Sequence, residues 1–443
     1  MKIQLSDHFN YRRLLRFTAP SIFMMIFTSI YSIVDGFFVS NLVGKTAFAA
    51  VNFAMPILMV LGAIGFMFGA GGSALIAKTM GEGHHKKAKE LFSTLVLCGA
   101  VCGIVLGVVG FFTIRPLCAM LGAEGQLLED SVRYSRTILL AMPFYLLQVE
   151  FQSFFIAAEK PQLGMWMTIV SGVLNMLLDW LLVGVCSMGL VGAGLATGIS
   201  QTVGGVLALL YFLFPNKGLL RLCRPKRDRR ALLKVCVNGA SELMSNVAMS
   251  ALGVLYNIQL LRYAGEDGVA AYGVVMYVMM IFLSVYIGYG TGIAPVVSFH
   301  FGAKNHTELK NLFRRSVRII LACSLLMFGS GLLFAEPLSR IFVGYDAALL
   351  QMTVRAMQVY SVSFLLSGVA ILGSCFFTAL NDGVTSAIIS FMRTLVFQSA
   401  AVMLMPLIWG VDGIWWSVVG SEAMAMATAV FFFYRHRHKF HYA

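Results

Sequence analysis

Charged residues are scarce in this chain of 443 residues. Asp, Glu, Lys and Arg together make up 12%, whereas hydrophobic residues make up 59% and the mean hydropathy is +0.82. A soluble protein of this length has too little interior volume to bury so much apolar sequence. Apolar runs of roughly twenty residues or more recur along the chain, and runs of that length cross a bilayer as helices. The composition therefore predicts an all-α integral membrane protein.

Acidic charge is scarcer than basic charge, with 20 Asp and Glu against 33 Lys and Arg and a net charge of +13. A basic excess can indicate a nucleic-acid partner, but 25 of the 33 basic residues lie on one set of alternating loops. Seven lie on the opposite loops, and Arg393 lies within an apolar run. This asymmetry is the positive-inside pattern of membrane proteins, so we expect no nucleic-acid partner and predict that both termini are cytoplasmic.

Motifs of enzymes and metal sites are missing. The eight cysteines form no CxxC or Cys/His ligand spacing, and Cys98 and Cys102, one helical turn apart, are expected to be small packing residues. The sequence contains no Walker A loop, no HExxH and no GxSxG. It therefore predicts neither an enzyme nor a cofactor.

The apolar runs predict twelve spans in two copies of a six-helix unit. The segment GEGHHKKAKELF (81–92) aligns with GAKNHTELKNLF (302–313) at an offset of 221, and two shorter segments repeat at the same offset. A basic connector lies between the copies, which divides the chain into residues 1–214, 215–233 and 234–443. The predicted spans are about 15–39, 52–77, 92–113, 133–157, 163–184, 190–214, 234–260, 271–299, 315–335, 354–379, 384–408 and 412–434.

Because six is an even number, both copies enter the membrane from the same side, and an axis along the membrane normal relates them. A pore usually needs a ring of such units. Two lobes in one chain instead favour a transporter that rocks around a cavity between them.

Six ionisable residues lie more than three residues from either end of a predicted span, where a charge is costly and is a functional candidate by default. They are Asp35, Glu150, Asp179, Glu242, Arg393 and Glu422.

Four polar residues in the first copy share one depth. Asp35 lies roughly 7 Å from the outer end of the first span, and Asp179 lies at a similar depth in the fifth. Asn175 is one turn from Asp179 on the same helix face, and Thr197 of the sixth span reaches the same level. Oxygen ligands of this kind suit Na⁺, and two close carboxylates suit a shared proton. Tyr31, one turn before Asp35, is expected to donate a supporting hydrogen bond.

The repeat supplies a control for this predicted site. At an offset of 221–222, Asp35 falls at about Tyr256, Asp179 at Ala400 or Ala401, and Thr197 at about Val418. None of these is acidic. Residues that only held the six-helix unit together would recur in both copies, so the pattern favours a coupling site in the first copy.

The sequence is compatible with more than one role for each of the other four charged residues. Glu242 and Arg393 lie on the helices that correspond to those of Asp35 and Asp179, and a salt bridge between them or a role with substrate or protons fits equally. Glu150 and Glu422 have no partner visible in the sequence, and each is a weaker candidate for attracting a cationic substrate.

Several segments together resemble the multidrug and toxic compound extrusion (MATE) transporters. They are YSIVDGFFVSNLVGKTAFAAVNFAMPI (31–57), the helix 1 Pro20, GEGHHKKAKELF, FIAAEKPQLGM (155–165), LNMLLDWLLV (174–183) and GLVGAGLATGIS (189–200). The second half resembles the bacterial branch of MepA-type exporters.

The resemblance implies a V-shaped pair of six-helix bundles in the bacterial plasma membrane. It implies a secondary-active antiporter that exports amphipathic, mostly cationic drugs in exchange for Na⁺ or H⁺ and contributes to antibiotic resistance. It assigns the cation to Asp35, Asn175, Asp179 and Thr197, and it makes Pro20 a hinge of helix 1. We expect a monomer whose partners are small drugs and the lipid bilayer.

A flippase or exporter of a lipid-linked or polysaccharide precursor is the alternative. Such a protein is expected to hold several cationic groups in its central cavity to bind phosphates. More than three residues from either end, the predicted spans contain one basic residue, Arg393, against five acids, which favours cationic cargo.

Overall fold

The computed structural model describes residues 3–215, 218–226 and 228–442, and this part of the chain is helical without strands. Parts of the predicted connector 215–233, namely residues 216–217 and 227, lie outside the described residues. The helices, including three π-helical segments η1 to η3, are α1 (Tyr11–Phe38), η1 (Val39–Val43), α2 (Lys45–Gly81), α3 (His85–Met120), α4 (Gly125–Leu139), α5 (Met142–Ala157), α6 (Pro161–Leu178), η2 (Asp179–Val185), α7 (Gly189–Leu213), α8 (Arg229–Gly302), α9 (His306–Val343), α10 (Ala347–Ala379), α11 (Gly383–Phe391), η3 (Met392–Phe397), α12 (Gln398–Leu404) and α13 (Pro406–Phe440).

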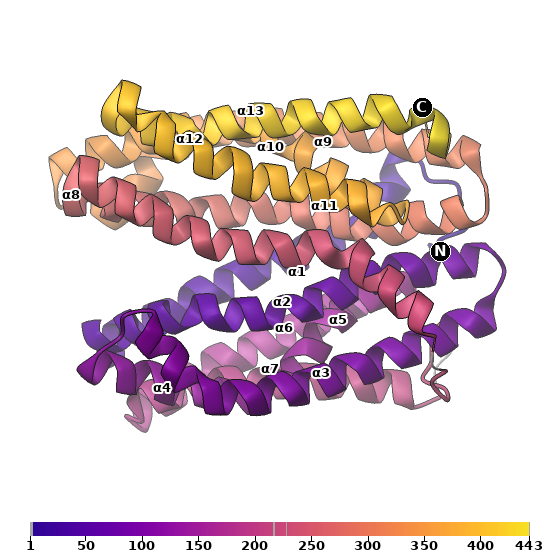
Figure 1. Ribbon diagram of the computed structural model, residues 1–443, viewed down its shortest axis with the longest axis horizontal. Coiled ribbons are helices and arrows are strands. Elements are labelled where there is room, and N and C mark those ends of the chain that lie inside the picture. The colour runs from indigo at the N-terminus through magenta and orange to yellow at the C-terminus, as the bar shows by residue number, and fades with distance from the viewer. Residues whose placement is uncertain (1–2, 216–217, 227, 443) are drawn as a thin grey trace.

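The number of membrane spans follows from two bends. Ten helices of the described residues are long and apolar enough to cross a membrane, and α4 with α5, bent by 60°, form an eleventh span. The 74 residues of α8 would extend about 111 Å if straight, far more than the ~30 Å of a hydrocarbon core. Gly265 interrupts α8 with a φ of 65°. Figure 1 shows that α8 turns back on itself, so α8 holds two spans. The total is twelve, and the predicted all-α membrane fold is confirmed.

The spans form two lobes that lie side by side (Figure 1). The first lobe contains α1 to α7, drawn in indigo to pink, and the second contains α8 to α13, drawn in salmon to yellow. Both chain termini lie at the same end of the molecule, which we call the terminal end. This placement follows from the even number of spans in each lobe.

The lobes approach each other most closely through α1 and α2 of the first lobe and α8 of the second. A Cβ atom on Gly288 of α8 would lie 2.6 Å from the Cα atom of Ile22, so this contact requires glycine. Nearer the terminal end, a Cβ atom on Gly302 would lie 2.1 Å from the carbonyl oxygen of Lys78. Near the middle of the helices, the Ser29 and Ser284 hydroxyls are 2.6 Å apart. The inter-lobe contact therefore extends from the terminal end to the middle of the spans.

The segment before α1 also joins the lobes at the terminal end. The backbone N–H of Leu5 donates to the Glu159 carboxylate of the first lobe at 2.7 Å. The backbone N–H of Phe9 donates to the Glu308 carboxylate of the second lobe at 2.9 Å, and His8 contacts the same carboxylate at 2.6 Å. The N-terminal segment is therefore bound to both lobes at once.

Buried apolar residues form two clusters. The larger cluster includes residues of both lobes, such as Phe92 and Phe376. The second cluster, which includes Val39, Val132 and Ala193, contains residues of the first lobe alone. These residues lie near the ends of α1 and α7 opposite the terminal end, so this part of the first lobe has its own apolar core.

Candidate functional site

Four helices of the first lobe bring polar side chains into its interior, away from the terminal end. Asp35 comes from α1, Asn175 from α6, Asp179 from the start of η2 and Thr197 from α7. The exposed fractions are 6% for Asp35, 2% for Asn175 and 0% for Asp179, and Thr197 is half-buried. The depth argument from the sequence placed these residues at one level, and the structure places them inside one bundle.

The carboxyl groups of Asp35 and Asp179 are close neighbours inside this bundle. Two ionised carboxylates are both acceptors, so a hydrogen bond between them would require that one of them carries a proton. Two negative charges this close in a buried site repel strongly, and a proton or a metal cation relieves the repulsion. The pair is therefore chemically suited to take up a single positive charge.

Few protein donors satisfy these side chains. Among the described residues, Oδ1 of Asp35, both carboxylate oxygens of Asp179 and both polar side-chain atoms of Asn175 have no hydrogen-bonding partner. Burying a polar group without a partner costs about 1–3 kcal/mol, and more for a charged group. Oxygen atoms left unpaired inside a helical bundle are the ligands that a small cation or a water molecule requires.

The backbone departs from α-helical geometry next to three intramembrane charges. The π-helical segment η1 begins four residues after Asp35, η2 begins at Asp179, and η3 contains Arg393. A π-helical turn widens the helix by one residue, leaves a carbonyl group less constrained and is frequent at functional sites.

Tyr134 of α4 is a member of the site that the sequence analysis missed. Its side chain is fully buried and lies close to both carboxyl groups and to Thr197, and its hydroxyl has no hydrogen-bonding partner among the described residues. The Thr197 hydroxyl donates to the carbonyl oxygen of Ala193 at 3.1 Å, which leaves its lone pairs free to accept from a phenol. A sequence signal exists: Ser131, Tyr134, Ser135 and Ile138 are buried with the spacing of one helix face.

Tyr31 and Pro20 lie on α1, as the sequence requires. The Tyr31 ring packs near Phe27, with ring centres 6.1 Å apart, and against Gly172 of α6. No hydrogen bond from Tyr31 to Asp35 is present among those of the described residues, so the expected supporting bond is not seen. Pro20 is buried, and α1 continues through it without a break.

The inward face of α6 is polar along its whole length. Gly164, Thr168, Ser171 and Asn175 are buried, whereas the apolar residues Trp166, Val170, Val173 and Leu177 are exposed. This pattern is the reverse of a soluble amphipathic helix and suits a helix whose outer face contacts lipid. The side of the first-lobe interior that α6 lines is therefore polar from Asp179 toward the terminal end.

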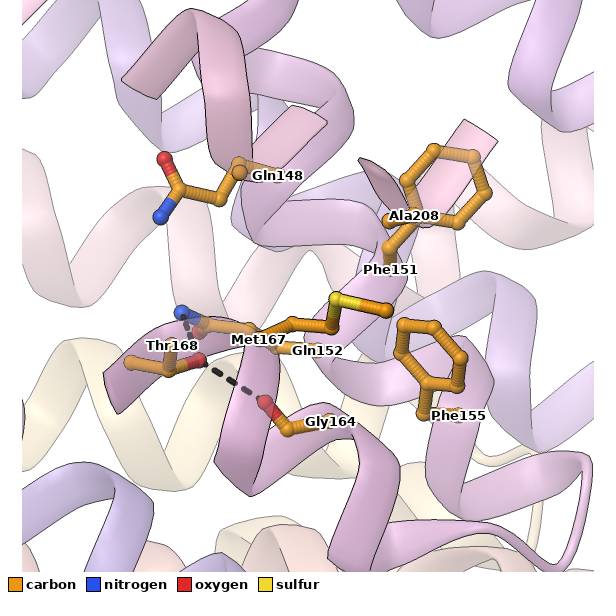
Figure 2. A pocket seen from close by; sticks show the side chains of 9 residues that line it. Gln148, Phe151, Gln152, Phe155, Gly164, Met167, Thr168 and Ala208 are labelled. Carbon is orange, nitrogen blue, oxygen red and sulfur yellow. Dashed lines mark hydrogen bonds between the residues drawn. The ribbon is translucent and has the colours of Figure 1, made fainter. Parts of the chain in front are cut away.

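A cavity of about 10 Å³ lies along this polar face (Figure 2). Gln148 and Gln152 of α5 face Thr168 of α6 across it, and Phe151, Phe155 and Met167 form its apolar side. The Gln148 amide donates to the Ser171 hydroxyl at 3.0 Å, and its Oε1 has no partner among the described residues. A cavity of this size is near the minimum that holds one water molecule.

Glu150 of α5 lies within the wall of the first lobe. It is fully buried, and neither carboxylate oxygen has a hydrogen-bonding partner among the described residues. Its carboxylate lies against Gly99 of α3, close to Cys98 and Cys102. In this conformation Glu150 is sealed from solvent, which differs from the expectation that it faces a substrate cavity.

Arg393 has a different partner from the one expected. The sequence analysis considered a pair between Glu242 and Arg393, but Arg393 binds Glu422 of α13 through two nitrogens at 2.8–3.0 Å. The pair with Glu242 was wrong because Glu422, on the neighbouring α13, presents both of its oxygens to the guanidinium. Glu242 is half-buried on α8 and lies near Cys375.

Twelve spans in two repeated lobes, with a buried carboxylate cluster in one of them, define a membrane transporter. Residues 20–181 and residues 243–404 each match the MatE family, at an offset of 223. The chain belongs to the MatE family of membrane transporters, and it is not an enzyme.

Named relatives cover almost the whole chain. It is 25% identical over 421 residues to the multidrug export protein MepA of Staphylococcus saprophyticus. The aligned region covers 94% of this chain and 91% of the relative. It is 23% identical over 421 residues to MepA of Staphylococcus aureus, with the same coverage.

Solved structures share the fold. The crystal structure of MATE in complex with MaL6 has a TM-score of 0.93 at 20% identity and covers 98% of each chain. An outward-facing conformation of a multidrug resistance MATE family transporter has a TM-score of 0.91 at 21% identity and covers 96% of each chain.

Proposed function

We propose that this protein is a secondary-active multidrug exporter that exchanges amphipathic, mostly cationic compounds for Na⁺ or H⁺ across a bacterial plasma membrane. The observation that carries the proposal is the buried pair Asp35 and Asp179, which has no basic partner among the described residues and no acidic equivalent at the matching positions of the second repeat. The relatives named as multidrug export proteins support an efflux role.

The lobe arrangement supports an assignment of conformational state. The lobes contact each other at the terminal end through α1, α2 and α8. With both termini cytoplasmic, as the loop charges predict, this contact closes the cytoplasmic side and corresponds to an outward-facing transporter. The similarity to an outward-facing MATE transporter agrees with this assignment.

The coupling mechanism follows from the charge of the carboxyl pair. In the outward-facing state, Asp35 and Asp179 take up H⁺ or Na⁺, and Asn175 and Thr197 complete the oxygen ligands. Neutralising the pair removes the repulsion between α1 and η2, which favours release of substrate and the return to the inward-facing state. Substrate from the cytoplasm or the inner leaflet then binds between the lobes and favours release of the cation.

Helix α1 is the element that transmits the change. It carries Asp35 at one end and contacts the second lobe through Ser21 and Ile22, next to Pro20. A proline in a helix lacks one backbone hydrogen bond and is a common kink site. Similar MATE structures have been solved in a bent and in a straight conformation.

The polar face of α6 offers a path between the carboxyl pair and the terminal end. From Asp179 toward the terminal end, the polar residues at helical spacing are Asn175, Ser171 and Thr168, and the cavity in Figure 2 continues the series. Gly204 keeps this path open, because a Cβ atom there would lie 2.8 Å from the amide carbon of Gln148. Water along this face would let the cation leave toward the cytoplasm without crossing the drug-binding region.

The flippase alternative is less well supported. Binding of a phosphate group needs free cationic groups, but the intramembrane Arg393 is neutralised by a bidentate ion pair with Glu422. The charge that remains within the spans is therefore acidic, which suits cationic cargo.

Efflux of a cationic dye from proteoliposomes tests the proposal, with a Na⁺ gradient and a pH gradient imposed separately. We expect Asp35→Asn and Asp179→Asn each to lower ion-driven efflux by about tenfold or more, because an amide cannot carry the charge change; tenfold corresponds to about 1.4 kcal/mol. Glu266→Gln is the matched control, because Glu266 is exposed and its loss removes the same charge. Full efflux in both aspartate variants, with normal insertion, would show that the pair is not the coupling site.

A further inference from the structure

A basic cavity lies at the terminal end, between the start of α1 and α9. Its volume is about 520 Å³, and it is lined by Lys310, Arg314, Arg315 and Arg318 of α9 and by Tyr11 of α1. The four basic residues follow positions i, i+4, i+5 and i+8 of one helix and therefore share a face.

Tyr11 arranges two of the guanidinium groups. Arg318 donates from Nη1 to the Tyr11 hydroxyl at 3.1 Å, and the Arg315 guanidinium stacks over the Tyr11 ring at 5.0 Å from its centre. The Nη1 atom of Arg315 is buried and has no acceptor among the described residues. A buried guanidinium nitrogen without an acceptor points to an anionic ligand, because an unpaired charged donor is costly.

The described lining of this cavity contains no Asp or Glu. The nearest acidic residue on the same helix, Glu308, accepts from the Phe9 backbone at 2.9 Å and from Asn311 at 2.8 Å, and it also contacts His8. Its charge is therefore engaged by the N-terminal segment, and the arginine face keeps its positive charge.

The repeat shows that the bundle itself does not require these arginines. At an offset of 221, Arg314 and Arg315 correspond to Ser93 and Thr94 of α3. There, the backbone N–H of Cys223 donates to the Ser93 hydroxyl at 2.8 Å, and that of Lys226 donates to the Thr94 hydroxyl at 3.2 Å. In the first lobe, the connector peptide thus covers the position that the arginine face occupies in the second.

We propose that this cavity binds the phosphodiester headgroup of an anionic phospholipid from the leaflet at the terminal end. Arginine binds phosphate oxygens through two parallel hydrogen bonds, and basic pockets between helices at the cytoplasmic side recognise anionic headgroups. Arg318 is twelve residues from the start of α9, roughly 18 Å along the axis, so its side chain reaches the boundary between headgroups and acyl chains.

An apolar strip beyond the cavity favours a lipid over a soluble anion. Leu321, Leu325 and Leu326 follow Arg318 on α9 and are 45%, 66% and 73% exposed. They continue toward the membrane centre from the arginine face, at i+3, i+7 and i+8 from Arg318. A phosphate bound by the arginines would therefore have its acyl chains beside exposed leucine side chains, which a free phosphate does not use.

The bound lipid would bridge the lobes, because Tyr11 belongs to the first lobe and the arginines to the second. Its occupancy therefore stabilises the arrangement in which the lobes meet at the terminal end. This inference does not depend on the coupling ion or on the exported drug.

Native mass spectrometry of the purified protein with added phosphatidylglycerol or phosphatidylcholine tests the site. We expect the double variant Arg315→Gln with Arg318→Gln to weaken phosphatidylglycerol binding by about tenfold and to leave phosphatidylcholine binding unchanged. Lys86→Gln with Lys87→Gln is the matched control, since it removes two exposed charges at the same end of α3 in the other lobe. Equal phosphatidylglycerol binding by the two double variants overturns the proposal.

Two further measurements keep the result decisive. Tyr11→Phe keeps the ring that stacks on Arg315 but removes the hydroxyl that accepts from Arg318. We expect this variant to lose less phosphatidylglycerol binding than the double arginine variant. It tests the site even if the double arginine variant does not fold. The second measurement adds inorganic phosphate as a competitor of phosphatidylglycerol. Displacement of phosphatidylglycerol by millimolar phosphate at the same site would assign the cavity to a soluble anion and would contradict the lipid.

Discussion

Individual charged residues in the second lobe illustrate how the structure selects partners. The Arg393 and Glu422 side chains are 18% and 7% exposed, and both guanidinium contacts fall at hydrogen-bonding distance. Arg355 and Asp412 form a similar pair near the surface, with side chains 64% and 41% exposed. The two pairs have similar geometry but different surroundings, so their contributions to stability differ.

Breaking the buried pair should destabilise the protein strongly. We expect Glu422→Gln to lower the free energy of unfolding by about 3 kcal/mol, because the Arg393 charge stays buried without its counter-charge. Asp412→Asn should cost at most about 1 kcal/mol, because its partner is exposed. Thermal unfolding in detergent measures both variants, and equal losses would contradict the assigned burial effect. The double variant Arg393→Met with Glu422→Leu should recover most of the lost stability.

Tyr134 shows the limit of the charge-based search at this scale. Asp35 and Asp179 are conspicuous because a carboxylate is unusual in an apolar run, whereas a tyrosine is not. Its role in the site depends on α4 lying against α7, which the structure shows through the Tyr134 contact with Gly194.

At the scale of the helices, close packing and bending are separate features of the fold. The approach of α1 to α8 depends on Gly288 and Gly292, where a Cβ atom would meet Ile22 or Thr18 of α1 at 2.6 Å and 3.2 Å. Small residues allow helices to approach closely within a membrane. By contrast, Gly265 and Gly410 have a positive φ, and a Cβ atom added at either position would meet no other atom within 4 Å. Gly265 and Gly410 therefore permit turns, whereas Gly288 and Gly292 permit contact between the lobes.

Enlarging Gly288 should therefore disturb the lobe contact. We expect Gly288→Leu to lower dye efflux by about tenfold, because the leucine side chain would overlap the α1 backbone and separate the lobes at this level. Gly329→Leu is the matched control, since Gly329 is exposed on α9 and a Cβ atom there meets nothing within 4 Å. Efflux that is equal in the two variants would show that the α1 contact is not needed during transport.

At the scale of the whole molecule, the lobes meet at one end and the carboxyl cluster lies toward the other. The contact includes the Ser29 and Ser284 hydroxyls, 2.6 Å apart, and the N-terminal segment bound to Glu159 and Glu308. Alternating access requires this contact to break when the cytoplasmic side opens.

A reversible cross-link tests that requirement. We expect Ser29→Cys with Ser284→Cys, in a background without the eight native cysteines, to form a disulfide under oxidation, because the two side chains already touch. The oxidised protein should lose efflux, and a reductant should restore it. Either single cysteine variant is the control, and efflux that persists in the fully cross-linked protein would contradict opening at this level.

The sequence by itself determined the membrane class, the repeated lobes and the level of Asp35, Asn175, Asp179 and Thr197. These features follow from local quantities, namely the length of apolar runs, the constant offset between copies and the rise per residue of a helix. Only the tertiary structure decided that Arg393 binds Glu422, that Glu150 is sealed inside the first lobe and that Tyr134 joins the carboxyl pair. Those outcomes depend on the rotation of each helix about its axis and on the distance between neighbours. Packing of many side chains together sets both, and no single segment contains that information.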